Sequence, residues 1–216
     1  MALNGARPRV APTAHDGTSR RVADVLAALV LLLLLGPLLL VGMAIVAAAG
    51  GRPVFFGHQR VGRGGRPFKC WKLRTMAVDA ELWLDRDPGL RERHEANGFK
   101  LPNASDPRVT LWGRWLRKTY IDEIPQLLNV LTGSMSLVGP RPIVPSELAL
   151  FGDEAPSLLS VKPGIFGAWN SLGRKRPPYP ERAALEVEYV HHRSLASDVL
   201  ILSRSVVAVL QGQGDE

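Results

Sequence analysis

The chain has 216 residues, enough for one ordinary domain with a substantial core and a few additional elements. Lysine and arginine outnumber aspartate and glutamate by 27 to 20 and the sequence pI is near 10.1, which points to a polyanionic neighbour: a nucleic acid, an anionic membrane face or a phosphorylated substrate. The single cysteine, Cys70, excludes an intrachain disulfide, and the histidines show no zinc-ligand spacing.

The N-terminal part contains a long uncharged segment. Residues 1–21 are basic and expected to be flexible, and an apolar run without any charge extends from residue 25 to residue 49. About 25 residues at roughly 1.5 Å each can cross a bilayer, and this run has no polar face. Three topologies are open: a cleaved signal peptide, a simple transmembrane helix, and a re-entrant hairpin. The run is far longer than a signal-peptide core of roughly 7–15 residues.

Gly36 and Pro37 fall at the midpoint of this run. Pro37 has no N–H to give to the carbonyl of Leu33, and Gly36 loosens the same turn. Each half would then be roughly 16–18 Å long, close to half a bilayer. Arginines flank the run on both sides, and positive residues prefer the cytoplasmic side. The pattern fits a membrane helix-break-helix over residues 22–50, although prolines also kink ordinary spanning helices.

Residues 51–216 are more polar and are expected to form one membrane-associated domain of catalytic size. Two short apolar-rich runs, residues 53–61 and 66–73, are separated by GRGG, which predicts a β-hairpin. A polar helix is expected over residues 78–86, up to the break at Asp87-Pro88-Gly89. The expected fold class is α/β of the α+β type, helix-rich with a small β-hairpin.

Two later stretches have the spacing of amphipathic helices. In residues 109–118, leucines and tryptophans fall on one side and basic residues on the other. Such a helix suits a lipid headgroup layer, and equally a protein core. Residues 194–210 also repeat apolar residues at helical spacing, but Asp198 and Arg204 make a membrane span unfavourable. This second helix would either close the core or lie on the membrane.

Asp122 and Glu123 form an acidic pair that follows a cluster of basic residues. One interpretation is structural: Thr119 caps a helix that starts near Asp122, and a helix N-terminus stabilises a carboxylate. The other is chemical: neighbouring side chains can converge on a ligand in front of the helix. Mg²⁺ commonly uses one or two carboxylates together with substrate phosphates. The surrounding cations would then bind those phosphates.

A stiff turn follows at residues 139–142, Gly-Pro-Arg-Pro. The two prolines fix the direction of Arg141, and a guanidinium matches two phosphate oxygens at once. Together with the acid pair, this turn favours phosphate chemistry over a charged surface that merely balances itself.

Four segments of the chain are specific enough to compare with a known family: RPVFFGHQRVGRGGRPFKCWKLRTM, DPRVTLWGRWLRKTYIDEIPQLLNVLTGSMSLVGPRPIVPSE, VKPGIFGAW and the final helix. Together they resemble the bacterial sugar transferases, the monotopic polyprenyl-phosphate phosphoglycosyl transferases, in their short form. The most specific combination is DEIPQLLNVL followed by MSLVGPRP. The resemblance extends from about residue 20 onward.

This resemblance implies transfer of a sugar-1-phosphate from a UDP-sugar to polyprenyl (undecaprenyl) phosphate, with release of UMP. The expected place is the cytoplasmic face of the bacterial inner membrane, where the reaction begins the synthesis of exopolysaccharide, O-antigen or another glycoconjugate. Asp122 would be the nucleophile that forms a covalent phosphosugar intermediate, and Glu123 with Asp122 would bind Mg²⁺. Phosphate or substrate contacts are implied for Arg141, Arg117, Lys72, Arg74 and Arg174. Gly36 and Pro37 would be the break of a re-entrant helix.

The chain departs from the family's pattern at a few positions. Lys175 stands where asparagine is usual, and Gly36-Pro37 replaces a common Ser-Pro. Glu186 occupies an acidic slot in which the family more commonly has aspartate. The first departure leaves the donor sugar open, and pairing with a second copy is open too. Two other classes remain as alternatives, a membrane-tethered nucleic-acid binder and a non-catalytic adaptor. The small number of aromatic residues argues against a nucleic-acid binder. A non-catalytic adaptor would not need the acid pair or Arg141, so it leaves these residues unexplained.

Overall fold

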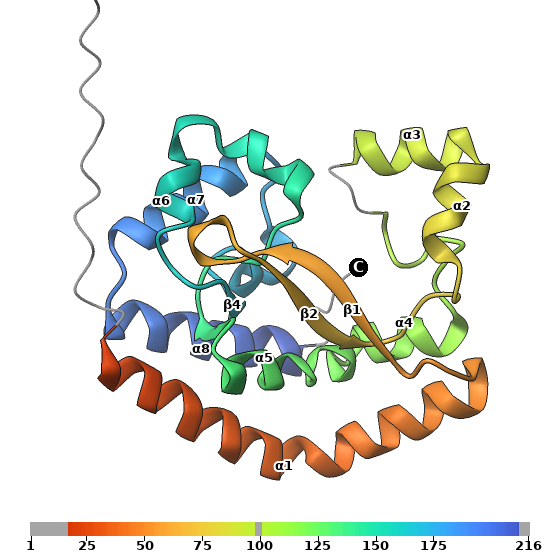
Figure 1. Cartoon of the computed structure of the whole chain (residues 1–216), viewed down its shortest axis with the longest axis horizontal. Helices are drawn as coiled ribbons and strands as arrows, with labels where there is room; N and C mark the ends of the chain where they lie inside the picture. Colours follow the sequence, from red (N-terminus) through yellow and green to blue (C-terminus); the bar gives the residue numbers. More distant parts are fainter. Residues whose placement is uncertain (1–16, 98–100, 212–216) are drawn as a thin grey trace, which may run out of the picture.

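The computed structural model describes residues 17–97 and 101–211, so most of the basic N-terminal segment lies outside the described part. The described chain begins with helix α1 (Thr18–Gly50), which runs along one side of the rest of the molecule (Figure 1). Within the described residues, α1 is the one helix long and apolar enough to cross a membrane by length and composition, with a mean hydropathy of 2.9 in its most apolar window.

Helix α1 is bent rather than broken. It continues through Pro37, and Figure 1 shows a change of direction near its middle. A proline removes one hydrogen bond and crowds the preceding turn, but the leucine-, valine- and alanine-rich turns on either side keep their own bonds. The predicted break at Gly36 and Pro37 is therefore wrong as a break and becomes a bend. The helix also begins at Thr18 rather than at residue 22.

One face of α1 packs on the domain and the other is exposed. Val46 is buried, and a Cβ added at Gly42 would lie 2.8 Å from side-chain atoms of Leu73 and Ile121, so the helix approaches the domain closely there. The opposite face is apolar and open, with Leu33 81% exposed. An exposed apolar face of this extent is typical of a surface that contacts a membrane or another protein.

The predicted hairpin is confirmed. Strands β1 (Phe55–Val61) and β2 (Pro67–Leu73) pair antiparallel, with His58 opposite Cys70. They are joined through the 3₁₀ turn η1 (Arg63–Gly65). Gly64 and Gly65 both have positive φ, a backbone conformation that glycine adopts without steric strain because it has no Cβ. The short glycine-rich turn fixes the register in which the two strands pair.

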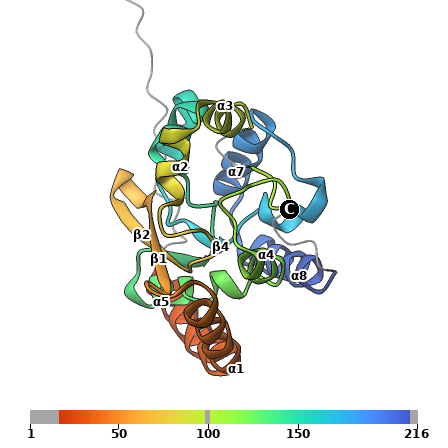
Figure 2. The ribbon, with the colours of Figure 1, turned by 90° about the vertical axis from the view of Figure 1, so that its right-hand side faces the viewer.

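Helices α2 (Ala80–Arg86) and α3 (Pro88–Ala96) meet at the predicted break. The Asp87 carboxylate accepts a hydrogen bond from the Leu90 N–H at 3.0 Å and so caps α3, while Pro88 occupies its first turn. Figures 1 and 2 show α3 on the side of the molecule away from α1. The next helix, α4 (Leu111–Lys118), begins at the Thr110 cap and lies against α1.

A second small sheet carries the turn at residues 139–142. Strands β3 (Ser136–Val138) and β4 (Gly164–Phe166) pair in parallel. The other elements are η2 (Ile121–Glu123), α5 (Gln126–Thr132), η3 (Pro145–Glu154), α6 (Ala155–Leu158), η4 (Asn170–Lys175), α7 (Glu181–His191) and α8 (Leu195–Leu210). The helix-rich architecture with small sheets agrees with the expected fold class.

The main core lies between α1, the hairpin, α5 and the second sheet. It contains Leu116, Val130, Met135 and Tyr189, together with Ala28 of α1. One face of the long apolar helix thus contributes to the domain's core.

The two amphipathic helices each divide between core and surface. In α4, Leu116 is buried, whereas Leu111 is 76% and Trp112 51% exposed. In α8, the regularly spaced Leu195 and Val199 are exposed, and the core face is formed by neighbours such as Ile201. Each helix therefore packs one face on the core and leaves apolar side chains exposed on another.

Candidate active site

The acid pair lies in η2, between α4 and α5. The preceding residue, Tyr120, has a φ of 57°, a left-handed backbone conformation that is uncommon for a bulky side chain and is often found at functional sites. This turn places Ile121 in the core and Asp122 at 4% exposure, and it leaves Glu123 facing strand β2.

The predicted helix cap at Thr119 is wrong. The Thr119 hydroxyl donates back to the carbonyl oxygens of Trp115 and Leu116 in α4, at 3.0 and 3.1 Å. Tyr120 and Pro125, which occupy the N-cap positions of η2 and α5, make no side-chain cap bond either. The structural interpretation of the acid pair therefore loses the capping bond on which it rested.

Lys72 of β2 contacts Glu123 of the acid pair. Its ammonium Nζ lies 2.5 Å from Glu123 Oε1, with both side chains mostly buried. Burial by itself lowers the pKa of Lys72, but the carboxylates of Glu123 and then Asp122 outweigh it and hold the pKa above its usual value. Lys72 is therefore a fixed positive charge beside both acids.

Arg141 is presented by the predicted turn after β3. The turn fits against β4 so closely that a Cβ on Gly164 would lie 2.0 Å from the Gly139 nitrogen. The Arg141 guanidinium donates to Asn170 Oδ1 at 3.3 Å, and its backbone N–H donates to Glu186 Oε1 at 3.3 Å. Arg141 is thus held by its backbone and by its side chain.

A cleft between the hairpin, η2, the turn and η4 brings these groups together. Its polar lining consists of Arg60, Lys72, Glu123, Gln126, Arg141 and Asn170. Three of the predicted site residues share this cleft, and Asp122 adjoins it in the chain. Three basic side chains around one acid make a site suited to an anion that carries several negative charges.

The sequence did not predict the buried ion pairs next to the Arg141 turn, which involve Glu147, Arg182 and Arg60. The Glu147 carboxylate accepts a hydrogen bond from Arg182 at 2.9 Å and lies 3.7 Å from Arg60, which in turn donates to the Pro142 carbonyl at 3.0 Å. Burial alone would raise the pKa of Glu147, but chiefly Arg182 holds it below its usual value. Glu147 is therefore a buried anion between two arginines, and only its place soon after the turn hints at this in the sequence.

Glu186, which the sequence marked only as the residue in the family's acidic slot, is 1% exposed, and it accepts a hydrogen bond from the Arg141 backbone. Burial raises the pKa of Glu186 from 4.5 to about 7, and Arg182 opposes that rise only in part. A raised pKa in the fold means that the protonated form is favoured there. Its contribution to stability is present below pH 4.5 and is lost as the pH rises through about 7.

We expect Glu186→Gln to remove this pH dependence. Relative to wild type, the variant should gain stability as the pH rises from 4.5 to about 7, by up to about 3 kcal/mol, and the difference should then level off. Chemical denaturation of both proteins at a series of pH values measures it. A constant difference across that range would show that Glu186 titrates normally.

Two predicted phosphate ligands lie elsewhere. Arg74 is 8% exposed and donates to the carbonyl oxygens of Gly50 and Gly51, at 2.6 and 2.9 Å, which ties it to the end of α1. Arg117 donates to Thr75 and to Asn103, at 2.8 and 2.9 Å. Neither lines the cleft. The side chain of Arg174 lies outside the described residues, and Gly36 and Pro37 lie within α1.

Comparison with known proteins identifies relatives of the whole described chain. A family model described as "Bacterial sugar transferase" matches residues 15–212. The exopolysaccharide production protein ExoY of Rhizobium meliloti is 43% identical over 202 residues, which cover 92% of this chain and 88% of the relative. An uncharacterized sugar transferase, EpsL of Bacillus subtilis, is 37% identical and is covered over 89% of its length.

A longer relative carries a more explicit name. The undecaprenyl-phosphate galactose phosphotransferase of Salmonella typhimurium is 41% identical over 199 residues, which cover 90% of this chain but 41% of that protein. The family model matches nearly all of the chain, and the match to ExoY covers most of both proteins. The chain belongs to the bacterial sugar transferase family.

Proposed function

We propose that the protein transfers a sugar-1-phosphate from a UDP-sugar to polyprenyl phosphate, releases UMP, and so begins the synthesis of an exopolysaccharide or related glycan. The observation that carries this proposal is the cleft in which Glu123, Lys72 and Arg141 meet beside Asp122. The names of relatives, which include an undecaprenyl-phosphate galactose phosphotransferase and a UDP-galactose-lipid carrier transferase, support the choice of acceptor and donor class.

In the proposed reaction, a carboxylate oxygen of Asp122 attacks the β-phosphorus of the UDP-sugar. The bond from that phosphorus to the bridging oxygen breaks, and UMP leaves with the electron pair. An oxygen of the polyprenyl phosphate then attacks the same phosphorus and releases Asp122 as a carboxylate. Lys72 and Arg141 hold phosphate oxygens and stabilise the charge that develops in both steps.

The acid pair also fits Mg²⁺. This ion commonly takes one or two carboxylates together with phosphate oxygens, and Asp122 and Glu123 would hold it. The described part of the chain has no cluster of three or more His, Cys, Asp or Glu side chains that could hold a metal ion, and substrate phosphates would complete the coordination. When bound, Mg²⁺ would neutralise phosphate charge near the reacting phosphorus.

We further propose that α1 enters and leaves the membrane by the same, cytoplasmic, face. At its start, the Arg21 guanidinium donates to the carbonyl oxygens of Val130 and Leu131 in α5. At its end, Arg74 binds the carbonyls of Gly50 and Gly51. A helix of 33 residues is roughly 50 Å long, and one that crossed a bilayer would carry its ends to opposite faces. Both sets of contacts to one domain argue for the bent, re-entrant arrangement.

Exposed apolar side chains support membrane contact beyond α1. Figure 1 shows α4, α5 and α8 in the layer next to α1. Leu111 and Trp112 of α4 and Leu195 and Val199 of α8 are at least half exposed. Tryptophan beside basic residues is typical of a helix in the headgroup region. These helices would lie in the membrane surface while α1 enters it.

Cysteine labelling tests the topology. In intact cells, an impermeant thiol reagent should label neither Gly5→Cys nor Gly214→Cys, and both should react after permeabilisation. The parent protein is the control, because its single cysteine, Cys70, is 2% exposed. Outside labelling at just one of the two positions would contradict the re-entrant arrangement. Pro37→Leu should favour a straight spanning helix and so expose one end.

A direct assay tests the reaction. The purified protein, incubated with a panel of UDP-sugars, Mg²⁺ and undecaprenyl phosphate, should release UMP with at least one sugar. A basic adaptor or a nucleic-acid binder would release none. The panel also identifies the donor sugar, which neither Lys175 nor the cleft determines by itself.

A further inference from the structure

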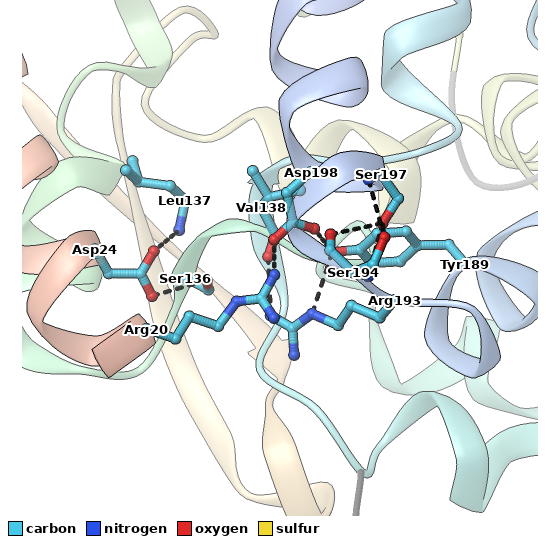
Figure 3. Close-up of polar contacts among 10 residues, drawn as sticks. All are labelled: Arg20, Asp24, Ser136, Leu137, Val138, Tyr189, Arg193, Ser194, Ser197 and Asp198. Atoms are coloured by element: carbon cyan, nitrogen blue, oxygen red, sulfur yellow. Dashed lines mark hydrogen bonds and ion pairs between the residues drawn. The ribbon is translucent and has the colours of Figure 1, made fainter. Parts of the chain in front are cut away.

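Strand β3, which leads into the Arg141 turn, is bonded to the beginning of the membrane helix. The Ser136 hydroxyl donates to Asp24 Oδ2 at 2.8 Å, and the Leu137 backbone N–H donates to Asp24 Oδ1 at 3.0 Å. Figure 3 shows the Asp24 carboxylate between these two groups. Asp24 is 8% exposed, although it immediately precedes the uncharged part of α1.

A second chain of contacts reaches the same strand from the same end of α1 (Figure 3). Arg20 forms an ion pair with Asp198 of α8, and the Tyr189 hydroxyl donates to Asp198 at 2.7 Å. Arg193 donates to Tyr189 and to the carbonyl of Val138, both at 3.2 Å. The first turns of α1 therefore connect to residues 136, 137 and 138 in succession.

The segment after β3 has little freedom to absorb a shift. Gly139 and Gly164 are packed backbone against backbone, and the Gly139 N–H donates to the Phe166 carbonyl at 3.0 Å. Pro140 and Pro142 fix φ on either side of Arg141. A displacement of β3 at Leu137 would therefore be carried along the chain to Arg141.

A buried carboxylate beside an apolar membrane segment is costly unless it is paired with donors. Helix packing alone does not require one at this position, because an apolar residue would pack α1 on the domain without desolvating a charge. The two donors that Asp24 binds belong to the strand that carries the phosphate-binding turn. Asp24 therefore bonds specifically to strand β3.

We propose that Asp24 is a positioning residue for Arg141: by holding β3, the membrane helix sets the place of the phosphate-binding turn. This inference rests on the proposed function in so far as Arg141 binds a substrate phosphate. Seating of α1 in the membrane and binding of the UDP-sugar are then linked, because the same helix turn that enters the membrane fixes the strand.

The test uses the full-length protein in nanodiscs and four variants. Asp24→Ala removes both bonds, Ser136→Ala removes one, and Asp24→Asn keeps both, because its amide can accept from Leu137 N–H and donate to the Ser136 hydroxyl. Val22→Ala is the matched control, since Val22 is half exposed on the same part of α1. Membrane content and thermal unfolding of each variant show whether it is folded and inserted.

Two readouts are measured. Asp24→Ala should increase amide hydrogen exchange of the peptide covering residues 136–144 and raise the KM for the UDP-sugar about tenfold, the size expected for lost hydrogen bonds to a charged group, with a smaller change in kcat. Ser136→Ala should change both in the same direction but less. Asp24→Asn and Val22→Ala should resemble wild type. Unchanged exchange, or faster exchange with an unchanged KM, would overturn the proposal.

A combination with Arg141 separates this inference from the proposed function. If Asp24 acts through Arg141, then Asp24→Ala should add little to the KM of Arg141→Lys. Additive effects of the two substitutions would overturn the positioning role. If Arg141→Lys itself leaves the KM unchanged, the assignment of Arg141 as a phosphate ligand fails instead, while the exchange measurement still reports on β3.

Discussion

Replacing Asp122 by asparagine is expected to abolish turnover and leave the fold intact. The amide keeps the shape of the carboxylate but is not an oxygen nucleophile of comparable strength, so the first chemical step is lost. Stability should change little, because the amide is nearly isosteric with the carboxylate. The measurement is UMP release from UDP-sugar and undecaprenyl phosphate, with thermal unfolding in parallel. We expect a loss of at least about 10³-fold.

The matched control is Asp153→Asn, an equal loss of charge at an exposed residue in η3. It should retain wild-type turnover. Near-normal turnover of Asp122→Asn would rule out a nucleophilic role for Asp122. Loss of activity together with loss of folding would instead point to a structural role of this buried acid.

Glu123→Gln should also reduce turnover strongly, by a different route. The substitution removes the proposed carboxylate ligand of Mg²⁺ and the negative partner of Lys72, whose ammonium lies 2.5 Å away. Lys72 would then be a buried cation with less compensating charge, which should weaken its proposed contact with a substrate phosphate. We expect a loss of about 10²-fold at ordinary Mg²⁺ and a partial recovery at higher Mg²⁺.

A Mg²⁺ titration of turnover distinguishes the two roles of Glu123. If Glu123 serves the metal, the Mg²⁺ concentration for half-maximal activity rises in Glu123→Gln. It should stay the same in Lys72→Met, which breaks the same ion pair but leaves the carboxylate in place. Equal Mg²⁺ dependence of wild type and Glu123→Gln would assign Glu123 to the positioning of Lys72 alone.

Local features of the chain could be predicted from the sequence. The hairpin follows from two apolar runs and a glycine-rich turn, and the cap and proline of α3 are visible in Asp87-Pro88. The acid pair and the Arg141 turn were recognised by residue type and spacing, and the structure brings Glu123, Lys72 and Arg141 to one cleft. The hairpin, the start of α3 and the Arg141 turn each depend on residues that are close in the chain.

The rest depends on contacts between distant segments. Lys72 and Arg74 looked equivalent in the sequence, but β2 ends at Leu73 and Arg74 turns to the end of α1. No periodicity reveals that Glu186 of α7 lies behind Arg141. One proline was read as a break in α1, whereas the surrounding apolar turns and the packing of both halves on the domain keep the helix continuous.

The mass of the protein after reaction with the donor alone tests most directly whether Asp122 carries the sugar phosphate. Wild-type protein given a UDP-sugar and Mg²⁺, without any polyprenyl phosphate, should release up to one equivalent of UMP and gain the mass of one sugar phosphate. Peptide mapping should place this mass on the peptide that contains Asp122, and adding undecaprenyl phosphate should remove it. UMP release that begins only when the lipid phosphate is present, or an added mass on another residue, would contradict the account.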